Sequence, residues 1–146
     1  NESNSSNIKF SDEICTGLQI VNFIQDVKRD SKLNRIYMPQ NDLIKFGVNE
    51  DDIFKGKSSK GFRDMIKFQC DRAEEILDNG KPLINQISGA KKIPISIFIQ
   101  SGKLVLKKIR NIDYETITTR PLVSQFDKSI IITRTLINFL LGRKLI

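Results

Sequence analysis

Apolar residues recur at helical spacing along most of this chain, and this periodicity limits its fold more than any other feature of the sequence. The clearest example is the segment 62–79, which places its apolar residues on one face of a helix and is followed by Gly80 and Pro82. Alternation of apolar and polar residues, which is typical of half-buried strands, is nearly absent. The sequence therefore predicts an all-α protein.

The boundaries of the expected helices follow from capping and helix-breaking residues. We expect a flexible polar start over residues 1–10 and one helical domain over residues 11–146. Ser11 is the expected N-cap of the first helix. The expected helices cover residues 11–30, 39–46, 62–79, 95–112 with an interruption at Gly102, and 125–141. Two segments rich in β-branched residues are ambiguous, and we interpret residues 93–100 as helical and 114–120 as a turn or short helix.

The chain is basic, with a formal net charge of +7 and no histidine. This charge indicates an anionic partner, which is a nucleic acid, an anionic membrane surface or a phosphorylated substrate. Because the basic residues are spread along the chain without interleaved aromatic residues, we do not expect nucleic-acid binding. The lack of histidine excludes histidine-dependent catalytic triads and the commoner zinc sites.

The two cysteines, Cys15 and Cys70, lack the spacing of metal ligands. We interpret both as buried free thiols, which favours a reducing compartment and a cytoplasmic location. The longest apolar stretch, residues 129–141, is interrupted by polar residues and is too short to span a bilayer.

A polar stripe runs along the helix expected over residues 17–30. At about 100° per residue, Gln19, Asn22, Asp26 and Asp30 fall within about an 80° arc of a helix that is otherwise apolar. A helix of this kind is usually buried, and buried carboxylates need a counter-charge, which a metal ion supplies. Carboxylates one turn apart suit Mg²⁺, which binds a few carboxylates together with substrate phosphate oxygens.

Spacing alone leaves a second interpretation open, in which Asp30 belongs to a solvated helix end beside basic neighbours. A similar pair, Asp71 and Glu75, lies on the amphipathic segment 62–79, and we interpret that pair as part of a solvated face. Two carboxylates four residues apart are therefore not sufficient to define a metal site.

The longer string of residues is more specific. Residues 18–48 resemble the second Asp-rich segment of the squalene/phytoene synthase family, in which a helix with Gln, Asn and a D-x-x-x-D pair leads into an R-I-Y-x-P loop. The matching residues here are Gln19, Asn22, Asp26, Asp30, Arg35, Ile36, Tyr37 and Pro39. The resemblance covers about residues 16–120. Gln25, directly before the first Asp, resembles the hydroxysqualene synthase branch of bacterial hopanoid biosynthesis rather than the phytoene synthases, which usually have Arg there.

The resemblance implies an all-helical isoprenoid-synthase fold with a central cavity. It also implies a Mg²⁺-dependent enzyme that converts presqualene diphosphate into hydroxysqualene and diphosphate. In this interpretation Asp26 and Asp30 are the metal ligands, and Gln19 and Asn22 bind diphosphate or water.

Three further residues take roles from the resemblance. Arg35 and Tyr37 match the family's active-site loop, where both would donate hydrogen bonds to diphosphate or Tyr37 would cap the cavity with its ring. Arg120 matches an arginine that can contact diphosphate, although Thr119 replaces the second arginine often found before it.

Family chemistry also needs a first Asp-rich helix from an N-terminal half, which we do not find before residue 17. We therefore expect this polypeptide alone to be inactive. Three alternatives remain: a synthase that couples two prenyl diphosphates such as farnesyl diphosphate, a non-catalytic family member that acts in binding or assembly, and a basic helical module. We also expect peripheral contact with the inner face of a membrane, where a hydrophobic product would leave.

Overall fold

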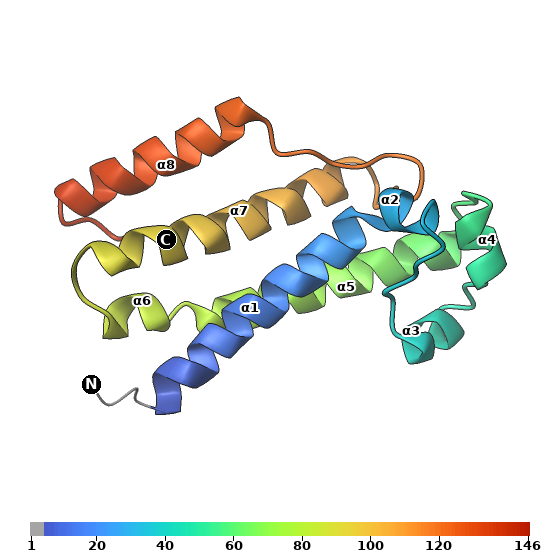
Figure 1. Ribbon diagram of the computed structural model, residues 1–146, viewed down its shortest axis with the longest axis horizontal. Helices are drawn as coiled ribbons and strands as arrows, with labels where there is room; N and C mark the ends of the chain where they lie inside the picture. The colour runs from blue at the N-terminus through green and yellow to red at the C-terminus, as the bar shows by residue number, and fades with distance from the viewer. Residues whose placement is uncertain (1–4) are drawn as a thin grey trace.

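The computed structural model describes residues 5–146, and within that range it contains helices and turns but no strands. Three long helices form its centre. They are α1 (Ser5–Gln25), α5 (Lys60–Gly80) and α7 (Lys92–Asn111). α1 packs against both α5 and α7, and α8 (Gln125–Leu140) packs against α7 (Figure 1). The all-α prediction is confirmed.

Short elements connect the long helices. α2 (Val27–Ser31), α3 (Gln40–Lys45) and α4 (Glu50–Phe54) lie at one end of the bundle (Figure 1). α6 (Leu83–Gln86) and the 3₁₀ helix η1 (Gly89–Lys91) join α5 to α7. Asn49 and Ser59 cap α4 and α5, because their side chains accept hydrogen bonds from Asp51 N and Phe62 N.

The start of α1 differs from the prediction. The helix already includes Ser5, so residues 5–10 are helical rather than flexible, and Ser11 lies inside the helix instead of capping it. Residues 1–4 of the expected flexible start lie outside the described residues. The polar sequence before Ser11 misled the prediction, because Phe10 and Ile14 pack beside α6 in a small apolar cluster that holds this part of α1 in place.

The helix expected over residues 11–30 is also interrupted. α1 ends at Gln25, Asp26 has φ −97° and ψ 7°, and α2 begins at Val27. The amide of Asp30 nevertheless donates to the carbonyl of Asp26 at 2.8 Å, so the two aspartates remain one turn apart.

Gly102 does not interrupt α7, contrary to the prediction. Gly102 instead lies at a close helix contact, where a Cβ would lie 2.9 Å from Leu18 Cδ2 and 3.1 Å from Leu77 Cδ1. Gly17 and Gly80 similarly allow α1 and α5 to approach each other. The two ambiguous segments are as predicted, since residues 93–100 are helical and residues 114–120 form turns and coil.

Candidate active site

Asp26 lies where α1 gives way to α2, and an arginine distant in the sequence binds it. Arg120 Nε donates to Asp26 Oδ1 at 2.6 Å, and Arg29 Nη1 lies 3.8 Å from Asp26 Oδ2. The Asp26 side chain is 20% exposed and that of Arg120 is 38% exposed. The carboxylate is therefore partly shielded and already matched by positive charge, unlike a freely solvated helix end.

The segment that carries Arg120 is anchored beside Asp26 by a second contact. Gln25 Nε2 donates to the carbonyl of Pro121 at 2.6 Å, and Pro121 is buried. The turns after α7 lead the chain to this point, with Asp113 and Tyr114 in left-handed backbone conformations. Gln25 thus fixes the backbone next to Arg120, and the bond brings Arg120 to the carboxylate.

Asp30, Arg35 and Tyr37 meet at a small cavity next to α2. The cavity has a volume of about 10 Å³, which is about the space of one water molecule. The amide of Arg35 donates to the carbonyl of Asp30 at 3.0 Å, and Asn34 has a positive φ of 55° that turns the chain back. The Tyr37 ring stacks on Phe23 of α1, with centroids 4.9 Å apart and an interplanar angle of 14°.

Gln19 and Asn22 lie on α1 before Asp26, and both side chains are exposed. The amide of Asp26 donates to the carbonyl of Asn22 at 3.0 Å, which keeps Asn22 one turn before Asp26. The opposite side of α1 is buried through Val21 and Ile24. Gln19 and Asn22 therefore face solvent rather than an enclosed space within residues 5–146, whereas Asp26 and Asp30 are partly shielded.

The structure thus brings the predicted residues together in two groups. Asp26 joins Arg120, and Asp30 joins Arg35 and Tyr37. Sequence reasoning assigned no role to Phe23 or to Gln25, although Gln25 was noted beside the first Asp. The stacking and anchoring roles of these two residues depend on partners 14 and 96 positions away, which local spacing does not reveal.

The second carboxylate pair differs from the first, as predicted. Asp71 is exposed and binds Lys67 Nζ at 2.8 Å and Arg110 Nη2 at 3.0 Å. The hydrogen bond from Lys67 lowers the pKa of Asp71 below its ordinary value, and Arg110 adds to the effect despite some burial. Glu75 is exposed as well. This pair belongs to a solvated, salt-bridged face of α5.

The residues around Asp26 fit Mg²⁺ only in part. No group of three or more metal-binding side chains (His, Cys, Asp, Glu) occurs within residues 5–146. Mg²⁺ commonly takes one or two carboxylates and completes its shell with substrate phosphates and water, and Asp26 with Asp30 could supply that share. A metal at Asp26 would compete with Arg120 for the same carboxylate, so the arginine would be released toward a bound anion.

Comparison with protein families shows that residues 1–127 match the squalene/phytoene synthase family model. The chain belongs to the squalene/phytoene synthase family. Its curated relatives include phytoene synthase 1 of Solanum lycopersicum, 30% identical over 112 residues, which are 77% of this chain and 27% of that protein. Phytoene synthase of Daucus carota is 32% identical over 110 residues, covering 75% and 28% of the two chains.

A solved structure resembles this squalene/phytoene synthase family member in fold as well as sequence. Squalene synthase HpnC from Alicyclobacillus acidocaldarius matches with a TM-score of 0.74 and 33% identity, over 76% of this chain and 42% of that one. The predicted isoprenoid-synthase fold is therefore confirmed. The chain spans 26% to 34% of the length of the first three curated relatives and less than half of the solved structure.

Proposed function

We propose that the protein acts in the Mg²⁺-dependent conversion of presqualene diphosphate into hydroxysqualene and diphosphate. The observation that carries this proposal is the ion pair between Asp26 and Arg120, with Asp30 one turn further on. It places a carboxylate and a guanidinium, which suit a metal ion and a diphosphate respectively, in direct contact. The similarity to squalene synthase HpnC supports the squalene branch of the family.

In this proposal each residue has a defined task. Asp26 and Asp30 would hold Mg²⁺, and the ion, when bound, supplies positive charge to the departing diphosphate. Arg120, released from Asp26, would donate hydrogen bonds to diphosphate oxygens, and Arg35, which lines a small cavity with Asp30, would do so as well. Gln19 and Asn22 would bind diphosphate or ordered water along the exposed stripe of α1. Tyr37, held by Phe23, would cap the prenyl tail.

The proposed reaction breaks one carbon–oxygen bond. The diphosphate leaves with the bonding electron pair, and hydrogen bonds from the two arginines stabilise its charge. The resulting cyclopropylcarbinyl cation rearranges, and water adds to it and releases a proton to solvent. No reductant is needed, because the carbon is captured by water rather than by hydride.

Product analysis with purified presqualene diphosphate and Mg²⁺, measured on the complete polypeptide, tests this proposal. We expect hydroxysqualene and diphosphate, and loss of most of the activity in Asp26→Asn. Asp71→Asn is the matched control, since that carboxylate is exposed and salt-bridged on α5. Full activity of Asp26→Asn, or equal losses in both variants, would refute the metal-ligand role.

A second function within the family is the coupling of two prenyl diphosphates, as in presqualene diphosphate or phytoene synthesis. It is favoured by the curated relatives, which include several phytoene synthases. Gln25 favours the first proposal, because it binds the Pro121 carbonyl from a position where phytoene synthases usually have Arg. Incubation with farnesyl diphosphate alone separates the two, since only a coupling enzyme would consume it.

A non-catalytic role in binding or assembly is the third candidate. The ion pair between Asp26 and Arg120 is compatible with this role, because the arginine neutralises that carboxylate without a metal. Mg²⁺-dependent binding of inorganic pyrophosphate to the complete polypeptide would argue against this role, and its absence would support it.

A further inference from the structure

The solvent-facing side of α8 is apolar, which is the reverse of the usual pattern for a surface helix. The large apolar residues that α8 exposes are Phe126, Ile130, Ile132, Leu136, Ile137 and Leu140. At about 100° per residue they share about a 160° arc. Phe126 and Leu140 are 75% and 79% exposed, so this arc is open to solvent in the structure. Exposed apolar patches of this kind mark interaction sites.

Contacts on the opposite side fix the orientation of α8. Ile131 and Thr135 are buried against α7, and Gln100 Nε2 donates to Thr135 Oγ1 at 2.9 Å. Asp127, the only acidic residue of α8, binds Lys108 Nζ at 2.9 Å. The single carboxylate of the helix is thus neutralised on the α7 side, and the apolar arc carries no negative charge.

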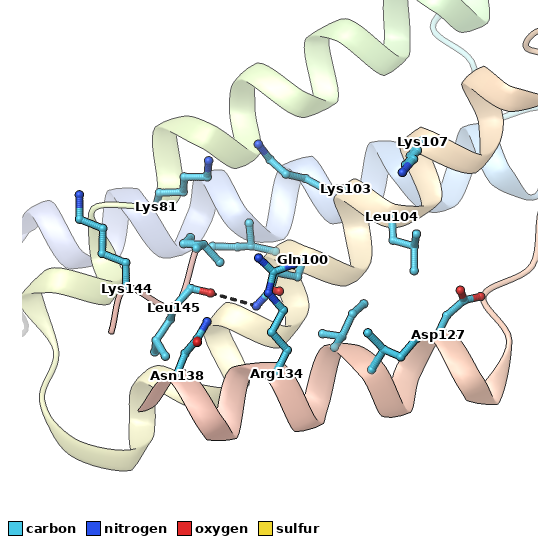
Figure 2. A pocket seen from close by; sticks show the side chains of 14 residues that line it. Lys81, Gln100, Lys103, Leu104, Lys107, Asp127, Arg134, Asn138, Lys144 and Leu145 are labelled. Atoms are coloured by element: carbon cyan, nitrogen blue, oxygen red, sulfur yellow. Dashed lines mark hydrogen bonds between the residues drawn. The ribbon is translucent and has the colours of Figure 1, made fainter. Parts of the chain in front are cut away.

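Positive charge borders this arc. A groove of about 620 Å³ between α7 and α8 is lined by Lys81, Lys103, Lys107, Arg134 and Lys144 above an apolar floor (Figure 2). Within residues 5–146, Lys107, Arg134 and Lys144 take part in no ion pair with a carboxylate. A smaller hollow of about 410 Å³ on α8 shares Ile130, Arg134 and Asn138 with the groove, so the cations and the apolar arc are continuous.

The chemistry of this surface distinguishes among anionic partners. No aromatic residue lines the groove, so it lacks the stacking platforms of single-stranded nucleic-acid sites. An apolar arc bordered by unpaired cations complements a bilayer with anionic headgroups. No helix within residues 5–146 is long and apolar enough to cross a bilayer, so α8 would lie in the plane of the interface. The match to the family model ends at residue 127, before most of α8.

We propose that the outer face of α8 and the adjoining cationic groove dock the protein on a bilayer that contains anionic phospholipids. Phe126, Ile137 and Leu140 enter the boundary between headgroups and acyl chains, and Arg134 and Lys144 contact lipid phosphates. This docking surface contains none of the residues assigned to diphosphate chemistry, so it goes beyond the proposed function.

A single tryptophan tests the proposal directly, because the chain contains none. Ile137→Trp places the probe on the apolar arc, and Ile44→Trp places it on α3, where Ile44 is 72% exposed. Each is mixed with vesicles of phosphatidylcholine alone or with added phosphatidylglycerol. We expect the fluorescence emission of the tryptophan at position 137 to shift to shorter wavelength only with the anionic vesicles. The emission of the tryptophan at position 44 should not shift with either kind of vesicle. Equal shifts at both positions, or no shift at position 137, would overturn the proposal.

Charge-removing variants test the cationic border in the same vesicle assay. Arg134→Gln and Lys144→Gln should each weaken binding to anionic vesicles by about fivefold. Arg72→Gln, an exposed arginine on α5, is the matched control and should not weaken it. Binding that is insensitive to Arg134 and Lys144, or equally sensitive to Arg72, would overturn the proposal, as would association into dimers that hides the arc and excludes vesicles. Asp26→Asn should bind vesicles normally, which separates this test from that of the reaction.

Discussion

Arg120 Nε and Asp26 Oδ1 lie 2.6 Å apart although 94 positions separate them in the sequence. The pair joins the turn region after α7 to the junction of α1 and α2. Because Pro121 is also held by Gln25, the arginine reaches the carboxylate from a fixed backbone. The pair orients the Asp26 carboxylate, and it holds a guanidinium next to the site that we propose for diphosphate.

Removal of Arg120 should affect ligand binding far more than stability. Both side chains are partly exposed, so we expect Arg120→Gln to lower the free energy of unfolding by less than about 1 kcal/mol. A charge-assisted hydrogen bond to phosphate contributes more free energy than this exposed ion pair contributes to stability. Binding of pyrophosphate with Mg²⁺ should therefore weaken by about tenfold or more. Calorimetric titration and denaturant unfolding of the complete polypeptide measure the two effects, with Arg72→Gln as control. Unchanged pyrophosphate binding would contradict the assigned role.

Gly80 and Gly102 should respond differently to alanine. A Cβ at Gly80 would lie 2.5 Å from Ile14 Cγ1 and 2.9 Å from the Phe10 carbonyl oxygen, and the backbone of α1 cannot easily move. Helix propensity favours alanine by about 1 kcal/mol, whereas overpacking costs about 1–3 kcal/mol. We therefore expect net destabilisation from Gly80→Ala.

Gly102→Ala provides the matched comparison, because it meets only the ends of the Leu18 and Leu77 side chains. We expect it to be close to neutral. Denaturant unfolding of both variants measures the difference. A Gly80→Ala protein as stable as the parent would show that α1 and α5 are not packed as closely as the structure indicates.

The two cysteines should differ in reactivity, which corrects the prediction that both are buried. Cys15 is exposed and Cys70 is fully buried in the core. Burial raises the pKa of Cys70 from 9.0 to about 12, and since the thiolate is the nucleophile the thiol stays inert. A thiol reagent at neutral pH should label one cysteine per native chain and two after denaturation, and Cys15→Ser should remove the native signal. Rapid native labelling of Cys70 would contradict this.

The same pKa shift predicts a pH dependence of stability. In the unfolded chain Cys70 releases its proton near pH 9.0, whereas in the folded chain it stays protonated until about pH 12. The unfolded state therefore binds fewer protons in this window, and the free energy of unfolding falls as the pH rises through it. Between about pH 9 and about pH 11, the parent protein should lose more stability than Cys70→Ala. Equal losses would show that Cys70 is not shielded.

The capping box of α8 should contribute measurably to stability. Ser124 Oγ accepts from the amide of Asp127, and the Asp127 carboxylate accepts from the amide of Ser124. Ser124→Ala should lower the free energy of unfolding by about 1 kcal/mol. Ser129→Ala, at an exposed position of the same helix, is the control and should not lower the free energy of unfolding. Equal stability of both variants would show that the cap does not hold α8.

Acid should weaken the same cap. The hydrogen bond from Lys108, followed by those from Ser124, lowers the pKa of Asp127 from 3.8 to about 2. The contribution of this carboxylate to stability is therefore fully present above about pH 4 and is lost as the pH falls through about 2. Circular dichroism melts across this range should show a smaller acid effect in Asp127→Asn than in the parent. An identical acid effect would contradict the assigned shift.

The sequence by itself determined the all-α class, most helix boundaries and the family, because these depend on local features. Apolar periodicity defines a helix within a few turns, and the D-x-x-x-D helix with its following loop is contiguous in the chain. For the same reason Asp30, Arg35 and Tyr37 were predicted together, since they lie within eight positions of one another.

Only the tertiary structure decided which distant residues meet. The contact of Arg120 with Asp26, the break in the helix at Asp26 and the continuity of α7 through Gly102 depend on packing between separate segments. The packing of α7 also decides which side of α8 faces outward, because Ile131 and Thr135 are buried while Phe126 and Leu140 are exposed. Helical spacing predicts that a helix has an apolar face, whereas packing against neighbouring helices decides whether that face is buried or exposed.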